Sequence, residues 1–316
     1  MKKSFKMLAL GLAVVPCALM LTACGGEQDL VNIKGDYVDL QTTEYNAVVE
    51  SIDQSFDINE IANGVKARIK IDASANMGAF GNIELSMDSE EIIKANVQNN
   101  QLLATNLEAY MKSSVYMKAT ATYGEEELVE EVQGTAKQYL RNGVQYVDLS
   151  GAKNLLDMVD IETPLKSYQI LSTGDSEPLT IPEISLTEFF ALIPEGEIGE
   201  SVVLSKSETE TGYKIKMVAD KVLLNEVVGG FLQETSFAVE FQSDAEMYMV
   251  FENEQFGGLY FDTDAILNVS IPSEHPMYQI IGSTLSVNLS INAQLVGFSG
   301  DIQYPNFSGY VNMSEE

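Results

Sequence analysis

The chain has 316 residues and a formal net charge of −29, with 47 acidic residues against 18 basic ones. Nucleic-acid binding depends on basic side chains that displace counterions from phosphates, so this charge balance excludes nucleic acid as an expected partner. Apolar residues make up 45% of the chain, which is enough for a folded core and argues against general disorder.

The first 26 residues are organised like an export signal. Lys2, Lys3 and Lys6 precede a mostly apolar run over residues 7–20. This run is shorter than the roughly 20 apolar residues of a membrane span, and Pro16 interrupts it. An ordinary secretory signal peptide would share the charged and apolar regions, but it would not need a cysteine at its end.

The run ends in Leu21-Thr22-Ala23-Cys24. This tetrapeptide resembles the lipobox of bacterial lipoproteins, in which an aliphatic residue and two small residues precede a cysteine. Cys17 fits that pattern poorly because Pro16 comes directly before it. The resemblance implies cleavage before Cys24, a diacylglycerol on its thiol and an acylated new amino terminus. We therefore expect anchoring in the cell membrane on the extracytoplasmic side, at the cell surface or in the periplasm.

Cleavage would remove three lysines and leave 15 basic residues against the 47 acidic ones. Such a charge repels an anionic lipid surface, so attachment must come from two or three acyl chains on Cys24, because a single chain binds only reversibly. With Cys24 lipidated, no thiol remains for a disulfide. We predict a signal peptide over residues 1–23, a lipidated cysteine and flexible tether over 24–43, and one globular domain over 44–316.

Along the chain, segments with the pattern of a helix alternate with longer segments that have the pattern of strands. Thr42 or Thr43 is a suitable cap for a helix that begins near Glu44 and stops at Asn63-Gly64. Residues 65–76 then alternate between apolar and polar side chains, which predicts a strand with one buried and one wet face.

The same alternation returns over residues 115–123, and Asn142-Gly143 between two such runs is a strong hairpin signal. Ser150 is a cap for a further helix. Between Pro182 and Pro194 we predict a short helix, and another around residues 222–231. Several alternating segments follow, the clearest over residues 285–295.

These elements predict an α+β fold with a large, curved, mostly antiparallel sheet, a half-barrel, and a few amphipathic helices on its apolar face. With the lipobox, the order of elements and the segment Tyr139–Ser150, the chain resembles the LolA–LppX–LprG group of lipoproteins and carriers. In that group a curved sheet wraps around helices and encloses an apolar cavity for acyl chains. No catalytic or ligand motif is shared, so the resemblance assigns no site residue.

The sequence favours no catalysis and no metal or cofactor. His275, the single histidine, stands between a glutamate and a proline, and no nucleophile motif accompanies it. Asp262-Thr263-Asp264 and Glu195-Gly196-Glu197 lack the spacing of a calcium loop. A glycosidase carboxylate pair stays open, because its separation is a property of the fold, although the absence of tryptophan argues against it.

The predicted inner face is rich in small and flexible residues, which have two interpretations. They form either a close-packed core or a deformable cavity for a lipid tail. The candidate lining residues are Ala67, Ala73, Met117, Ala119, Met217, Met247, Met249, Phe189 and Phe190. Residues 186–193, which include the two phenylalanines, are a candidate lid or a plug of the core.

The leading functional hypothesis is a binding or carrier lipoprotein for an apolar or lipid ligand. The rival is a surface module that binds a protein or an envelope polymer, and a hydrolase comes third.

Overall fold

The computed structural model describes residues 30–55, 64–77, 81–98, 101–123, 126–159, 161–171, 179–180, 199–232, 237–253, 255–271, 273, 278 and 282–313. Cys24, His275, Glu195-Gly196-Glu197 and the predicted lid over residues 186–193 with Phe189 and Phe190 lie outside these residues. Among the described residues, no helix is long and apolar enough to cross a membrane.

The strands are β1 (Val38–Asp39), β2 (Val65–Asn76), β3 (Asn82–Gln98), β4 (Gln101–Tyr123), β5 (Glu126–Arg141), β6 (Val144–Gly151), β7 (Lys166–Ile170), β8 (Leu179–Thr180), β9 (Val202–Glu208), β10 (Gly212–Ala219), β11 (Phe237–Phe241), β12 (Ala245–Glu252), β13 (Gln255–Ser270), β14 (Thr284–Gly297) and β15 (Val311–Asn312). The helices are α2 (Thr42–Ser55), α4 (Lys153–Val159) and α6 (Lys221–Leu232).

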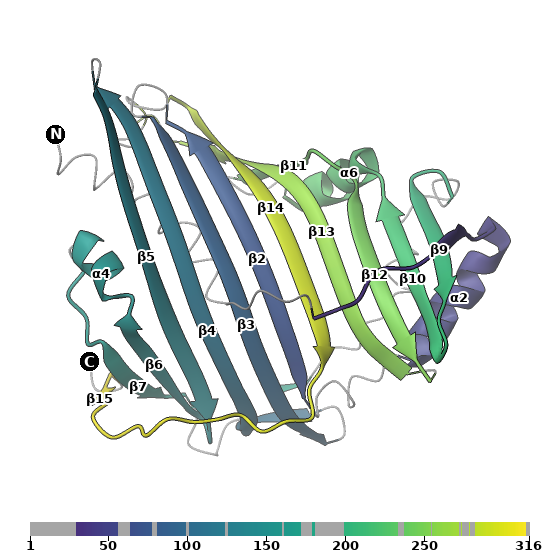
Figure 1. Ribbon diagram of the computed structural model, residues 1–316, viewed down its shortest axis with the longest axis horizontal. Coiled ribbons are helices and arrows are strands. Elements are labelled where there is room, and N and C mark those ends of the chain that lie inside the picture. The colour runs from purple at the N-terminus through teal and green to yellow at the C-terminus, as the bar shows by residue number, and fades with distance from the viewer. Residues whose placement is uncertain are drawn as a thin grey trace.

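All these strands belong to one 15-stranded sheet with the order β1-β9-β10-β12-β13-β14-β2-β3-β4-β5-β6-β7-β15, in which β11 pairs with β13 and β8 with β4 (Figure 1). The pairings are antiparallel except between β15 and β7. The predicted α+β class with a large, mostly antiparallel sheet is confirmed. The predicted hairpin is also present, since Asn142 and Gly143 connect β5 to β6 with φ angles of 52° and 73°.

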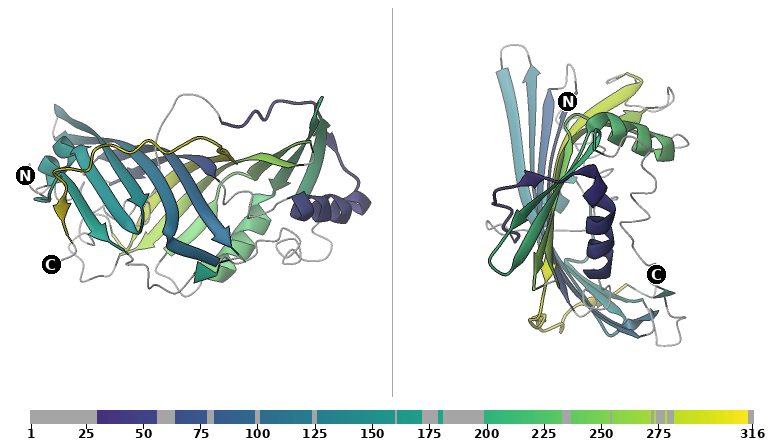
Figure 2. Two further views of the ribbon diagram at one scale, coloured as in Figure 1. Left: turned by 90° about the horizontal axis from the view of Figure 1, so that it is seen from below. Right: turned by 90° about the vertical axis from the view of Figure 1, so that its right-hand side faces the viewer.

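The sheet has two distinct faces (Figure 2). We call inner the face that carries α2 and α6, and outer the face along which residues 30–37 and 298–310 run. Because successive side chains of a strand point to opposite faces, the paired residues Leu289 and Ala73 belong to the inner face, while their neighbours Asn288 and Ser74 belong to the outer one.

Two buried clusters build the core on the inner face. The first joins Tyr45, Val49 and Ile52 of α2 to β9, β10 and β12, where Ile215 and Phe251 are fully buried. The second lies where β2, β3, β4 and β14 run together and comprises Ala73, Ala75, Met77, Leu85, Met117, Leu285 and Val287. The helix and the alternating strands thus bury the faces that their sequence periods predict.

The amino-terminal helix starts slightly earlier than predicted. It begins at Thr42 instead of near Glu44, and Gln41, the residue directly before it, forms hydrogen bonds with its first turn. The Glu44 carboxylate accepts the backbone N–H of Gln41 at 2.8 Å, while the N–H of Glu44 donates to the Gln41 carbonyl at 2.8 Å. The glutamate therefore supplies the capping interaction that the sequence had assigned to a threonine.

The prediction of a flexible tether over residues 24–43 is wrong for residues 30–43, the part that the structure describes. Residues 30–37 lie against the outer face, and β1 pairs with β9 at the edge of the sheet. The polar composition of this segment gave no sign that it binds to the sheet. The residue that holds it is far away in the sequence: Gln294 Oε1, 264 residues from Leu30, accepts the Leu30 N–H at 2.7 Å.

Candidate ligand-binding face

The middle of the inner face is apolar and only half-buried. The register of β13, β14 and β2 places Phe261, Ala293 and Ile69 in one cross-strand row, with Ile291 and Ile71 in a neighbouring row. Leu259, Leu295 and Ala67 continue this surface in the row beyond Phe261. We call these eight residues the apolar strip, and each of them keeps part of its surface exposed.

The strip lies between the two buried clusters. Leu259 packs against the first cluster, which α2 covers, and Leu289, beside Ile291 on β14, packs against the second. Strands β3 to β7 bend toward the side that carries the helices (Figure 2). The strip is therefore an incompletely covered apolar surface between two filled cores, on the side toward which the sheet curves.

Three polar residues border the strip on the same face. Thr263, paired with Ile291, is 4% exposed, and its hydroxyl has no hydrogen-bond partner in the described part of the chain. Ser89 and Glu91 pair with Ile69 and Ala67. Burial raises the pKa of the Glu91 carboxyl, since the charged form loses hydration there. An amphipathic molecule with a long apolar part would find matching groups here.

The predicted lining residues do not converge on one site. Ala73 and Met117 belong to the second cluster, whereas Met217 and Met249 belong to the first, with Met247 packed against it. Ala119 is buried at 2% exposure, and only Ala67 belongs to the strip. Small and flexible residues thus mostly fill the cores in the described structure.

Sequence reasoning overlooked the residues that form the strip. Ile69, Ile71, Ile291 and Ala293 stand in the two alternating segments from which the strands were predicted. Their exposure depends on where the helices end over the sheet, and the alternation alone does not carry that information. The register of three strands, far apart in sequence, decides it.

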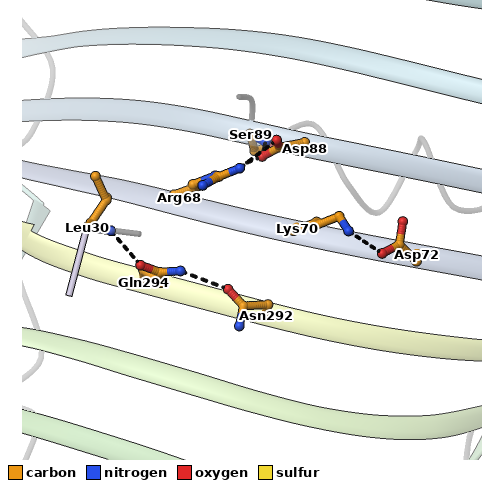
Figure 3. Close-up of polar contacts among 8 residues, drawn as sticks. All are labelled: Leu30, Arg68, Lys70, Asp72, Asp88, Ser89, Asn292 and Gln294. Carbon is orange, nitrogen blue, oxygen red and sulfur yellow. Dashed lines mark hydrogen bonds and ion pairs between the residues drawn. The ribbon is translucent and has the colours of Figure 1, made fainter. Parts of the chain in front are cut away.

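The outer face carries a ladder of polar contacts across β14, β2 and β3 (Figure 3). Arg68 donates to both carboxylate oxygens of Asp88, at 3.0 and 2.8 Å, and Lys70 lies 2.8 Å from Asp72. Gln294 donates to Asn292 at 3.1 Å while its own carbonyl accepts Leu30. These pairs keep charged side chains solvated on one side and tie the amino-terminal segment to the sheet.

A shallow groove of about 460 Å³ lies on the same outer face. Its polar lining comprises Asp72, Ser74, Glu84, Ser86, Tyr116, Gln242, Asp264, Asn288 and Ser290. Although burial alone would raise the pKa of Asp72, hydrogen bonds from Lys70 and Ser86 hold it below its ordinary value. The groove therefore offers carboxylates, hydroxyls and amides beside the apolar residues Ala73, Leu85, Ala265 and Leu289.

The acidic pair Asp262 and Asp264 is separated from Thr263 by the alternation of β13, which turns the threonine inward. Asp262 accepts a hydrogen bond from Asn292 at 3.2 Å. Within the described residues, no three His, Cys, Asp or Glu side chains come together in a way that would hold a metal ion.

The fold and the two faces define an open, curved, mostly antiparallel sheet protein with helices on one side. No family model matches the chain, and no curated protein matches its sequence. Among solved structures, LprF from Mycobacterium bovis is similar over 84% of this chain and 98% of its own, at 8% identity and a TM-score of 0.28.

Two further solved structures show lower scores. The translocator domain of the autotransporter NalP from Neisseria meningitidis aligns with 81% of this chain and 95% of its own, at 7% identity and a TM-score of 0.19. OccK3 (OpdO) from Pseudomonas aeruginosa aligns with 87% and 75%, at 8% identity and a TM-score of 0.13. Matches at these scores carry no argument about function, which is inferred below from this chain's own residues.

Proposed function

We propose that this protein is a lipid-anchored lipoprotein of the bacterial cell envelope that binds an apolar ligand, such as an acyl chain, without chemical turnover. The observation that carries this proposal is the apolar strip of the inner face. Burying apolar surface is worth about 25 cal/mol per Å², so a surface of this kind beside two filled cores gains free energy when a long apolar molecule covers it.

Polar groups at the border of the strip support an amphipathic ligand over a purely apolar one. The Thr263 hydroxyl is buried without a partner, and an unmade buried hydrogen bond costs about 1–3 kcal/mol. A ligand hydroxyl or carboxyl group that displaces the atoms covering this hydroxyl would supply the missing hydrogen bond. Glu91 adds a carboxyl group on the same face, and burial raises its pKa because the charged form loses hydration there.

Two substitutions on opposite faces of β14 test the proposed binding. Ala293→Phe fills the strip with a ring and keeps it apolar, whereas Ser290→Phe adds the same ring to the outer face. We expect calorimetric titration with a fatty acid to show binding to the wild type and Ser290→Phe, and weakened binding to Ala293→Phe. A negative heat-capacity change should accompany it. Absence of binding to the wild type would sink the proposal.

The lipid anchor is a separate part of the proposal and has its own test. It is supported by the tetrapeptide Leu21-Thr22-Ala23-Cys24 and the signal-like segment before it. Cys24→Ala should abolish acylation and leave the precursor unprocessed. Metabolic labelling with a fatty acid measures this, and undiminished label in the variant would contradict the anchor.

A second candidate function, the binding of a hydrophilic partner, is favoured by the groove of about 460 Å³ on the outer face. Its carboxylates and hydroxyls suit an envelope polymer or a protein loop. If this function holds, Tyr116→Ala should weaken partner binding, because Tyr116 is 36% exposed in the groove, while fatty-acid binding to the inner face stays unchanged.

A further inference from the structure

The apolar strip gives way to a polar surface at β3. The cross-strand row that contains Ala67 of the strip continues with Glu91 on β3, Met111 on β4 and Gln138 on β5. The neighbouring row passes through Ser113 on β4. We call Glu91, Ser113 and Gln138 the polar patch, and each of them keeps part of its surface exposed. Strip and patch therefore form one continuous surface of the inner face, apolar on one side and hydrogen-bonding on the other.

Side-chain amides extend the polar patch toward the edge of the sheet. Gln169 Nε2 donates to Gln145 Oε1 at 3.2 Å, and Gln145 Nε2 donates to Gln138 Oε1 at 3.1 Å. The Nε2 group of Gln138, at the end of this chain of amides, makes no hydrogen bond within the described residues. Strands β3 to β7 bend toward the side that carries the helices, so this donor lies on the concave part of the face (Figure 2).

Glu91 is a carboxyl group without a cation beside it. Its neighbours across the strands are Ala67 and Met111, and its neighbours on the same face of β3 are Ser89 and Ile93. Among the ion pairs of the described residues, none involves Glu91. Burial raises the pKa of this carboxyl, and no positive charge offsets the rise.

The basic residues of the chain are turned away from this surface. All 15 that follow Cys24 lie within the described residues. Eleven of them stand on β2, β3, β4, β5, β7 and β10, and their cross-strand pairing turns each of these to the outer face. Strands β13 and β14, which carry most of the strip, contain no lysine or arginine.

The other four basic residues have partners or positions elsewhere. Lys34 belongs to the segment along the outer face, and Lys221, at the start of α6, donates to a backbone carbonyl at 3.3 Å. Lys153 pairs with a carboxylate of its own helix at 2.6 Å, and Lys206 with a carboxylate of β9 at 2.7 Å. No lysine or arginine of the described chain is thus placed to meet an anion on the strip or the polar patch.

This distribution of charge decides which headgroups the inner face can hold. A phosphate or carboxylate that binds there would lose water without gaining a cationic partner, and a buried charge without a partner is costly. A hydroxyl group avoids this cost, because it can donate to the Glu91 carboxyl and accept from Gln138 Nε2. The polar patch therefore matches a neutral headgroup that carries hydroxyls.

From the continuous surface, the unused amide donor and the absence of basic residues on it, we propose that the ligand of the inner face carries an uncharged, hydroxyl-bearing headgroup. The headgroup binds to Glu91, Ser113 and Gln138, while the chain of the ligand covers the apolar strip. This inference rests on the proposed function and specifies the class of its ligand. Glycerol and sugar headgroups supply the same hydroxyl chemistry.

Calorimetric titration with ligands of equal chain length tests this preference. Lauroylglycerol and dodecyl glucoside carry uncharged hydroxyl headgroups, whereas laurate and dodecyl phosphate are anionic. Each is titrated below its micellar concentration. We expect the wild type to bind the two uncharged ligands about tenfold more tightly than the two anionic ones. The tighter of the uncharged two distinguishes glycerol from sugar. Equal or tighter binding of the anionic ligands would overturn the proposal.

A matched pair of lysine substitutions locates the headgroup. Gln138→Lys supplies the missing cation within the polar patch, whereas Gln133→Lys adds the same charge to the outer face of β5, where residue 133 is exposed opposite Tyr116. We expect Gln138→Lys to bind dodecyl phosphate about tenfold more tightly than the wild type does, and Gln133→Lys to bind it as the wild type does.

The outcomes separate this inference from the function on which it rests. If both folded variants keep the wild-type affinity for dodecyl phosphate, or gain equally, the headgroup does not lie on the polar patch. If the wild type binds none of the four ligands, the proposed binding of an apolar ligand is itself contradicted.

Discussion

At the scale of single residues, the face of the sheet to which a side chain points decides how much its replacement lowers the free energy of unfolding. Leu289 packs against the second buried cluster, whereas Asn288 is exposed on the outer face and donates a long hydrogen bond of 3.5 Å to Ser74. The two residues share a strand and a local sequence, so they form a matched pair.

Leu289→Ala should lower the free energy of unfolding by about 2 kcal/mol, the lower end for a large-to-small change, because the leucine is half-buried. Asn288→Ala should change it by less than about 0.5 kcal/mol. Urea unfolding measures both. Equal shifts of the two midpoints would show that the faces of β14 are wrongly assigned.

Gln294 is the residue that holds the amino-terminal segment. Gln294→Met keeps the length of the side chain and removes the acceptor of the Leu30 and Val31 N–H groups. Hydrogen exchange of these two amides should become faster, while exchange in the centre of β2 should stay slow. Unchanged protection at Leu30 and Val31 would mean that another group binds the segment.

At the scale of elements, the carboxy-terminal segment is attached by aromatic contacts. Tyr110, Tyr139 and Tyr146 stand in one row across β4, β5 and β6. On this row Phe307 stacks against Tyr146 at 3.7 Å, and Tyr310 meets the same ring edge-on at 5.7 Å. Such contacts add to the burial of apolar area and bring β15 to β7.

Tyr310 makes this attachment sensitive to alkaline pH. Burial, with help from the Asp148 charge, raises its pKa to about 12. Because the folded state favours the neutral phenol, this stabilisation is complete below the ordinary pKa of about 10 and is lost as the pH rises toward 12.

Tyr310→Phe should therefore lose less stability than the wild type as the pH rises from about 10 toward 12. At neutral pH we expect little change, because the buried Tyr310 hydroxyl has no partner among the described residues. Urea midpoints at several pH values give the comparison. Parallel losses in both proteins would contradict the assignment of this alkaline sensitivity to Tyr310.

The sequence was most informative about single strands and their connections. Alternation in residues 65–76 and 285–295 predicted β2 and β14, and Asn142-Gly143 predicted the β5–β6 hairpin. The docking of residues 30–37 was not predictable in this way, because hydrogen bonds to a buried glutamine leave no periodic pattern. Long-range side-chain contacts become visible only when the register of the sheet is known.

At the scale of the whole molecule, the candidate site arises from the arrangement of distant segments. Phe261, Ala293 and Ile69 come from three strands whose order around the sheet does not follow the chain. Composition pointed to Ala73, Met117 and Met249 instead, which the structure places in filled cores. Fold class follows from local periodicity, but exposure of a face depends on how helices cover the sheet.

The central claim is that the inner face holds an apolar ligand. Native mass spectrometry of residues 25–316, produced without the anchor, measures this most directly. We predict a protein that carries a co-purifying lipid or takes up added fatty acid or phospholipid, with less bound ligand in a folded Ala293→Phe variant. A wild-type domain that is free of ligand and takes up neither lipid would contradict the account.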